Sequence, residues 1–232
     1  MKESMKKRRL AIIPARGGSK RIPRKNIKPF LGKPIILHVL EKISGGELFD
    51  QLHVSTEDRE ILEIVSAAGF SPPFSRDPLL AGDHTPLSQV LRSVVQRYRE
   101  QGERFDTIVL IFATAVLLEP ETLSRALLQF ESMDGSAEMI SVAKYPVPIE
   151  WAMRMEPSGE MTPVQREKLS VRSQDLHEAW YETAEFVLYD EESLFAEHDT
   201  PPRIGFPVSH LSIDIDTMED WAMAERIARV AG

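Results

Sequence analysis

The chain has no cysteine and no apolar run that approaches the ~20 residues needed for a membrane-spanning helix. The lack of cysteine excludes a disulfide framework, a thiolate zinc site and a cysteine nucleophile. The basic N-terminus is not followed by a long apolar segment, which argues against a signal peptide. The net charge of −8 argues against broad nucleic-acid binding. We therefore expect a soluble, cytoplasmic protein that binds neither nucleic acid nor membranes.

Apolar runs and amphipathic stretches alternate along most of the 232 residues. Short apolar runs predict strands, and apolar residues at helical spacing predict helices between them. This alternation is typical of a doubly wound, mostly parallel sheet, so we expect an α/β fold in a single domain over 1–232. The strands are expected at Leu10–Pro14, Leu52–Ser55, Thr107–Ala113, Met139–Ala143 and Ser212–Asp216. The helices are expected over Lys33–Ser44 and after Thr56, Pro86, Pro120 and Thr217.

The alternation breaks between Tyr145 and about Pro202, where prolines and charges replace long periodic runs. Such a stretch does not read as further strand–helix units of a parallel sheet. We expect an antiparallel excursion or arm here, inserted before the last strand.

A glycine pair lies among five cationic side chains in Ile12–Asn26, "IIPARGGSKRIPRKN", directly after the first expected strand. Turns at the carboxyl edge of such a sheet bind ligands, and glycine lets backbone N–H groups approach an anion. The charge density suits a triphosphate rather than a single carboxylate. The spacing matches neither a P-loop nor the dinucleotide-binding pattern, and a basic surface loop is the alternative. The glycines are Gly17 and Gly18, and the cations are Arg16, Lys20, Arg21, Arg24 and Lys25.

A second constellation is "SIDIDT", Ser212–Thr217. In a strand, Asp214 and Asp216 would point to one face, and Ile213 and Ile215 to the other. Two like charges this close favour a cation between them. Carboxylate oxygens at a strand end suit Mg²⁺, which also takes oxygens from phosphates. The alternative is a solvent-facing edge followed by a helix N-cap.

The glycine-containing loop is very similar to the signature of the acylneuraminate cytidylyltransferases, which make CMP-activated nonulosonic acids. The resemblance extends over nearly the whole chain, through "LHVSTEDREI", "SRDPLLAGDHTPLSQVL", "RSQDLHEAWYETAEF" and "SIDIDTMEDW". Among the branches of the family, Arg172–Ala179 most resembles the pseudaminic acid cytidylyltransferases. The resemblance implies a Rossmann-like fold with a dimerisation arm, at about 145–180, that is exchanged between the protomers of a homodimer.

The resemblance also implies a CTP-dependent nucleotidyltransferase. In that reaction the anomeric hydroxyl of a nonulosonic acid attacks the α-phosphorus of CTP, pyrophosphate leaves, and Mg²⁺ stabilises the reacting oxygens. Two alternatives stay open: a CMP-Kdo synthetase-like enzyme, and a non-catalytic nucleotide-binding homologue. The implied catalytic residues are Lys20, Arg172, Asp214 and Asp216, with both aspartates as Mg²⁺ ligands. The implied substrate-binding residues are Arg16, Gly17, Gly18, Ser19, Lys25, Asn26, Arg76, Phe112, Thr114, Gln174, Glu182 and Glu185.

The chain departs from the pseudaminic-type pattern in two places, which suggests an altered acceptor pocket. It reads "FATAVLL" at Phe112–Leu118, where those sequences tend to read "YATAPFL". It reads "ETAEF" at Glu182–Phe186 in place of "DAGQF". Ala184 adopts a positive φ less readily than glycine, and Glu185 only accepts hydrogen bonds where glutamine also donates. We therefore expect Glu185 to face the sugar and to favour a donor-rich substituent, such as a free amine.

Overall fold

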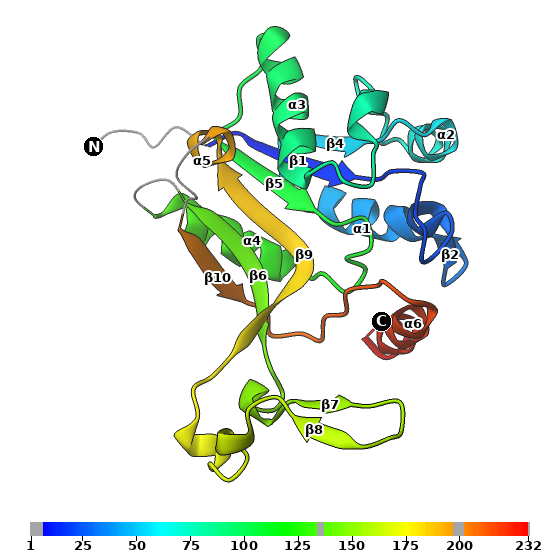
Figure 1. Cartoon of the computed structure of the whole chain (residues 1–232). Helices are drawn as coiled ribbons and strands as arrows, with labels where there is room; N and C mark the ends of the chain where they lie inside the picture. The colour runs from blue at the N-terminus through cyan, green and yellow to red at the C-terminus, as the bar shows by residue number, and fades with distance from the viewer. Residues whose placement is uncertain (1–6, 134–136, 197–201, 232) are drawn as a thin grey trace.

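Six strands form the central sheet of the computed structural model, which describes residues 7–133, 137–196 and 202–231. The strands are β1 (Arg9–Pro14), β4 (Gln51–Ser55), β5 (Thr107–Ile111), β6 (Glu138–Lys144), β9 (Trp180–Asp190) and β10 (Arg203–Pro207). Their order is β10-β6-β9-β5-β1-β4 (Figure 1). Strand β9 runs antiparallel to both of its neighbours, and the other paired strands are parallel. The mostly parallel sheet predicted from the sequence is therefore confirmed.

Helices cover both faces of the sheet, as a doubly wound fold requires. They are α1 (Ile35–Ser44), α2 (Arg59–Ala67), α3 (Leu87–Glu100), α4 (Pro120–Glu131), α5 (Glu191–Phe195) and α6 (Met218–Ala231). Alternate residues of β1 enter different layers: Ala11 and Ile13 join the core with α1, α2, α4 and α6, whereas Leu10 and Ile12 join the core with α3 and α5. No helix among the described residues is long and apolar enough to span a membrane.

The last predicted strand is wrong, because Ser212–Asp216 has no strand pairing and β10 takes the edge position beside β6. Gly205 lets these strands lie close together, since a Cβ atom there would be 3.1 Å from Val142 Cγ2. The chain leaves the sheet after Pro207 and buries Ile215 completely in the larger core. The alternation in "SIDID" therefore reflects a buried isoleucine in a coil rather than a strand.

Two helix starts differ in detail from the predictions. Helix α1 begins at Ile35, because Lys33–Pro34 pairs in a small hairpin. Helix α2 is capped by Asp58 and not by Thr56: Asp58 Oδ1 accepts a hydrogen bond from Ile61 N at 3.1 Å. Thr56 Oγ1 instead accepts from Asp58 N, so the threonine supports the capping residue.

Strands β6 and β9 continue beyond the body of the protein into a small antiparallel hairpin (Figure 1). An antiparallel excursion was expected in this stretch, but the chain then returns through β9 into the middle of the sheet, which was not expected. The arm exposes Met153, Met155 and Met161 on its hairpin and Trp180 at the start of β9. The short strands are β2 (Pro29–Phe30), β3 (Lys33–Pro34), β7 (Met153–Met155) and β8 (Met161–Pro163).

Strand β9 has a backbone irregularity at Ala184, whose φ is +53°. The register between β6 and β9 shifts beside it. The left-handed region is unfavourable for an L-residue with a side chain, which agrees with the glycine of the pattern that this chain resembles. Ser141 Oγ fills the gap in the ladder by accepting hydrogen bonds from Thr183 Oγ1 at 2.8 Å and Phe186 N at 3.2 Å.

Candidate active site

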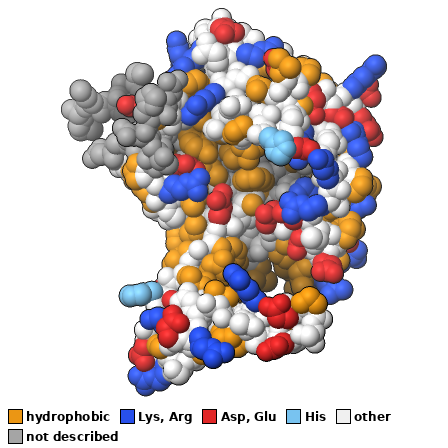
Figure 2. Space-filling view, in the orientation of Figure 1, with side chains coloured by type: hydrophobic (Ala, Val, Ile, Leu, Met, Phe, Trp, Pro, Cys, Tyr) orange, Lys and Arg blue, Asp and Glu red, His pale blue; other side chains and the backbone are white. Residues whose placement is uncertain are grey.

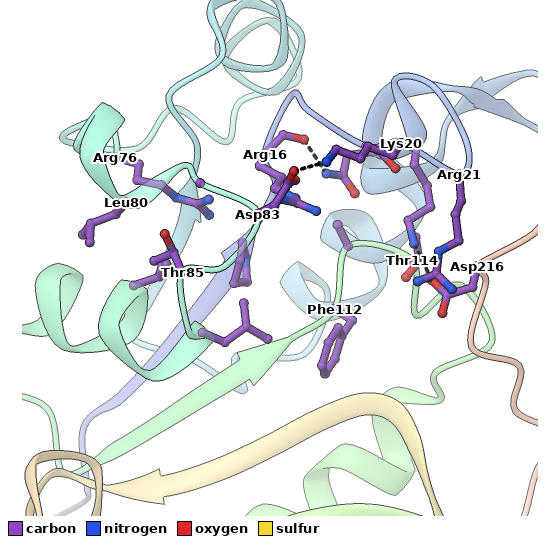
Figure 3. A pocket seen from close by; sticks show the side chains of 18 residues that line it. Arg16, Lys20, Arg21, Arg76, Leu80, Asp83, Thr85, Phe112, Thr114 and Asp216 are labelled. Carbon is purple, nitrogen blue, oxygen red and sulfur yellow. Dashed lines mark hydrogen bonds and ion pairs between the residues drawn. The ribbon is translucent and has the colours of Figure 1, made fainter. Parts of the chain in front are cut away.

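A cavity of about 550 Å³ opens at the carboxyl ends of β1 and β5, with the start of α3 on one side (Figure 3). This is the edge at which open α/β sheets bind ligands. In the space-filling view, basic and acidic side chains lie together beside a hollow on this face (Figure 2). Most of the predicted site residues line the cavity: Arg16, Ser19, Lys20, Lys25, Asn26, Arg76, Phe112, Thr114 and Asp216.

Two cations of the loop face one carboxylate across the cavity. Arg16 Nη1 lies 2.6 Å from Asp83 Oδ1, and Lys20 pairs with the other oxygen of Asp83 (Figure 3). The hydrogen bond from Lys20, together with that from Arg16, lowers the pKa of Asp83. Asn26 connects the two ends of the loop, since its Nδ2 donates to Arg16 O at 3.0 Å. A polyphosphate entering here would compete with Asp83 for both cations.

Two further cations surround Asp216. Arg21 Nη2 lies 2.8 Å and Lys25 Nζ 3.3 Å from Asp216 Oδ1. Lys25 Nζ also donates to Ile215 O at 2.7 Å. These contacts join the loop after β1 to the coil that carries Asp216, although the two segments are far apart in the sequence.

The glycine pair has two different roles. Gly17 N donates to Glu57 Oε1 at 3.1 Å, so this N–H is already used within the protein. A Cβ atom on Gly17 would lie 2.2 Å from Asp58 Oδ2, which means that packing requires the glycine. A Cβ on Gly18 would meet no atom within 4 Å. Gly18 is therefore the better place for an anion to approach the backbone.

The expectation that all five cations serve a triphosphate is wrong for Arg24. Its Nη1 and Nη2 donate to the two oxygens of Asp58 at 2.5 and 2.8 Å, and Nη2 also donates to Glu60 at 2.6 Å. Arg24 is not among the residues that line the cavity. Its charge is neutralised at the start of α2 and helps to hold the loop against that helix.

The opposite wall of the cavity combines one fixed cation with apolar surface. Arg76 is buried, and it donates to Ser55 O at 2.6 Å and to Ser55 Oγ at 3.1 Å. Burial lowers its pKa, although Glu57 at 3.7 Å acts in the other direction. Leu80 and Leu87 line the same side. This wall suits a nucleoside better than a row of phosphates.

The two predicted metal ligands differ in exposure. Asp216 lines the cavity and is partly buried, whereas Asp214 does not line it and is exposed as a residue, although its carboxylate is partly shielded from water. Desolvation of its carboxylate and the charge of Asp216 raise the pKa of Asp214, against the effects of Lys25 and Arg21. No group of three or more metal-ligating side chains occurs in the part of the chain that the structure describes. A divalent cation here would need phosphate and water oxygens as well, which is how Mg²⁺ is commonly held.

Besides Gly17, Gly18, Asp214 and Glu185, three predicted site residues in the arm or on β9 do not line this cavity. Arg172 lies in the arm, where its Nε donates to Asp175 at 2.8 Å and its side chain is 71% exposed. Gln174 lines a separate cavity of about 380 Å³, also in the arm. Glu182 is exposed on β9. None of the three lies in the cavity that the loop after β1 forms in this chain.

The prediction that Glu185 faces the sugar is wrong. Its side chain is 2% exposed, and its two oxygens lie 2.8 and 3.0 Å from His210 Nε2. A buried carboxylate needs such a partner, because an unpaired charge is costly to bury. Sequence reasoning missed His210, since it lies 25 residues farther along the chain in a coil without a periodic pattern.

Other cavity residues were also missed. Asp83, Thr85 and Leu87 all line the cavity, but none was predicted as a site residue. The sequence feature that could have identified them is the "GDHT" segment before α3. This segment is far from the loop in the sequence and lies beside it only in the folded protein. The start of α3 therefore completes a site that begins at β1.

The sequence matches the family model described as cytidylyltransferase over residues 10–228. It is 32% identical over 230 residues to a pseudaminic acid cytidylyltransferase of Campylobacter jejuni, covering 95% of this chain and 96% of that protein. It is 27% identical over 224 residues to a CMP-N,N'-diacetyllegionaminic acid synthase of Legionella pneumophila, covering 94% and 95%. The match to a 3-deoxy-manno-octulosonate cytidylyltransferase of Brucella suis is 32% over 133 residues, or 57% of this chain and 49% of that protein.

The fold is also similar to that of a solved CMP:2-keto-3-deoxy-manno-octonic acid synthetase complexed with CTP. The TM-score is 0.69 at 16% sequence identity, covering 97% of this chain and 98% of that one. The family match includes both the loop after β1 and the coil with Asp216, the two segments that meet in the cavity. The chain belongs to the cytidylyltransferase family.

Proposed function

We propose that this chain transfers CMP from CTP to a nonulosonic acid of the pseudaminic type and releases pyrophosphate. The observation that carries the proposal is the cavity in which loop cations meet Asp216 opposite the buried Arg76. Full-length similarity to proteins named for pseudaminic and legionaminic acids supports the acceptor class. The Kdo alternative has less support, because that match spans about half of each protein.

The triphosphate of CTP would lie along the loop, where Arg16, Lys20 and Arg21 can each neutralise phosphate charge. The nucleoside would lie against Arg76 and Leu87. This arrangement lets the loop hold the β- and γ-phosphates as they leave, while the opposite wall holds the part of CTP that is transferred.

The donor set at Asp214 and Asp216 fits Mg²⁺, since two carboxylates leave coordination positions for phosphate oxygens and water. Desolvation, followed by the charge of Asp216, raises the pKa of Asp214, and a cation bound beside the two carboxylates would act in the opposite direction. When bound, Mg²⁺ would neutralise charge that develops on the reacting oxygens. Arg21 and Lys25, which pair with Asp216 in this structure, would then be available to phosphate.

The reaction joins the anomeric oxygen of the sugar acid to the α-phosphorus of CTP. The bond between that phosphorus and the oxygen shared with the β-phosphate breaks, and the leaving group is pyrophosphate. The protein contributes by fixing the two substrates in line and by placing cations around the phosphates. No covalent intermediate with the protein is required.

We also propose a homodimer that is formed through the arm, 145–180. The arm displays Met153, Met155 and Met161, and Figure 2 shows hydrophobic patches among its charged side chains. Exposed apolar patches of this kind commonly mark interfaces. Each cavity lacks Arg172 of its own chain. Exchange of arms would bring Arg172 of the partner subunit to it instead. Mixing Arg172→Ala with Asp216→Asn protein should then restore activity, because some mixed dimers contain one intact site.

The direct test is purified protein with CTP, Mg²⁺ and a panel of pseudaminic, legionaminic and Kdo acids, with pyrophosphate release as the readout. Turnover with a nonulosonic acid supports the proposal. Turnover with Kdo alone would establish the first alternative, and CTP binding without turnover on any acid would establish the non-catalytic one. The cytoplasmic location expected from the sequence stays a prediction.

A further inference from the structure

The coil between β10 and α6, residues 208–217, carries both aspartates that we propose as Mg²⁺ ligands. It has no strand pairing, so contacts at its two ends fix its position. At the end near α6, Ile215 is fully buried, Lys25 Nζ donates to Ile215 O at 2.7 Å, and Asp216 N donates to Asp220 Oδ2 at 3.1 Å. The other end is held against the sheet. Val208 N donates to Val142 O at 2.9 Å, and Ser212 Oγ donates to Thr183 O at 3.3 Å. Between these two attachment points lies His210.

His210 is joined to β9 by a buried contact between charged groups. Its Nε2 lies 2.8 and 3.0 Å from the two oxygens of Glu185, and the side chains are 9% and 2% exposed. The glutamine of the pseudaminic-type pattern could hydrogen-bond to a histidine here but could not form an ion pair with it. This ion pair, the Glu185–His210 bridge, therefore depends on the glutamate of this chain.

Two glutamates face His210, and three further titratable side chains, His38, Lys42 and Arg226, line the same cavity. Burial disfavours the imidazolium, but the hydrogen bond and charge of Glu185, together with Glu119 at 3.4 Å from Nδ1, outweigh burial and raise the pKa of His210. Lys42, from α1, lies near both glutamates and donates to the backbone oxygens of Val116 and Leu118. Arg226, from α6, lines the same cavity as His210.

We propose that Glu185 and His210 are positioning residues, whose bridge holds the 208–217 coil against β9 and so places Asp214 and Asp216 for Mg²⁺ and CTP. This inference rests on the proposed function through the role of the two aspartates. Neither residue needs to touch substrate. Removing the bridge leaves the aspartates in place along the chain but lets the coil that carries them move.

The bridge makes metal binding dependent on pH. His210 is protonated, and the ion pair is complete, below the ordinary histidine pKa of about 6.5. Because the folded pKa is raised, the contribution to stability is lost only as pH rises through that higher value. We therefore expect Mg²⁺ affinity to fall on the alkaline side, with a midpoint at the pKa of His210.

The test compares wild type, Glu185→Gln and His210→Gln. NMR titration gives the pKa of His210, and calorimetry of the CTP complex gives Mg²⁺ affinity across the same pH range. In Glu185→Gln, the pKa of His210 should fall, and Mg²⁺ affinity near neutral pH should drop about 10-fold or more, as for other residues that orient metal ligands. Glu63→Gln, on the exposed surface of α2, is the matched control and should change neither quantity.

His210→Gln separates positioning from folding. Glutamine can donate an amide N–H to Glu185 but is neutral at every pH. This variant should therefore show, at every pH, the lower Mg²⁺ affinity that wild type reaches on the alkaline side, without a decline of its own. The same decline as in wild type would overturn the inference, as would wild-type affinity in Glu185→Gln after its His210 pKa has fallen. If Glu185→Gln does not fold, the His210→Gln profile decides alone. Absence of pyrophosphate release by wild type would overturn the proposed function, while the calorimetry would still judge the bridge.

Discussion

Gly17 and Asp58 are so close that a methyl group on the glycine would lie 2.2 Å from Oδ2 of the aspartate. Asp58 cannot move freely, because it is held by Arg24 and caps α2 through Ile61 N. Gly17→Ala should therefore break this arrangement and lower the free energy of unfolding by about 1–2 kcal/mol, the usual cost of a lost cap. Urea unfolding measures it. Gly18→Ala, with open space around the added methyl, is the control and should keep wild-type stability.

Lys20→Ala should weaken CTP binding without affecting the fold, because the Lys20 side chain is 79% exposed. Loss of one charge-assisted contact should lower CTP affinity about 10-fold or more, with less effect on CMP and a larger effect at low salt. Calorimetry with both nucleotides measures the difference. Asp83→Asn should act in the opposite direction, because it removes the carboxylate that competes for Lys20 and Arg16. Equal losses for CTP and CMP would mean that Lys20 does not contact the terminal phosphates.

Asp216→Asn should lower turnover by about 10²-fold, the size of other single electrostatic deletions in active sites. The fold should survive, because the ion pairs lost with Arg21 and Lys25 are partly exposed and contribute little. Steady-state rates at limiting Mg²⁺ are the measurement. Glu219→Gln changes a nearby exposed carboxylate and should leave turnover unchanged. Wild-type rates in Asp216→Asn would remove the metal assignment.

Ala184→Gly should stabilise the protein by about 1 kcal/mol, because glycine adopts the positive φ found here without the steric cost of a Cβ atom. Ala143→Gly, in a regular part of β6, is the matched control and should destabilise through the greater chain entropy of glycine. Thermal or urea unfolding compares the two. A destabilised Ala184→Gly would show that the bulge costs little strain.

Acid should destabilise the fold through His53. This side chain is fully buried, and burial, followed by the charges of Arg97 and Arg76, lowers its pKa to about 3. The unfolded chain then binds more protons than the folded chain between about pH 6.5 and 3, so stability falls as pH drops through this range. His53→Asn should give a shallower decline in the free energy of unfolding with acid. An unchanged slope would assign acid sensitivity to other groups.

The sequence predicts best where one local pattern decides the structure. Thr107–Ile111 is apolar at every position after Thr107, and it is a central strand buried on both faces. The loop after β1 could be located because glycine and cations gather there. In contrast, Ser212–Asp216 has the alternation of a strand, but β10 occupies the position beside β6. Periodicity reports which side chain is buried, and cannot report what it is buried against.

Predictions about contacts between distant residues fail for a related reason. Glu185 was interpreted as a sugar contact because its neighbours resembled a substrate-binding motif. Its partner, His210, becomes visible only when β9 and the coil lie side by side. Likewise, Arg24 belongs to a cationic motif but is neutralised by Asp58, 34 residues away. Charge in a motif is an upper limit on the charge that reaches a ligand.

The antiparallel strand in the middle of the sheet also affects how the chain is made. During synthesis β1, β4 and β5 emerge first, but β5 pairs with β9 through residues such as Ile111 and Phe186, which lie far apart in the sequence. Until β9 leaves the ribosome, the half-formed sheet has an open edge at β5 that is mostly apolar, the kind that pairs with other chains. Pairing at such long sequence separation is also slow. The nascent protein is therefore most prone to aggregation after β5 and before β9, and this interval is when a chaperone would have the most to protect.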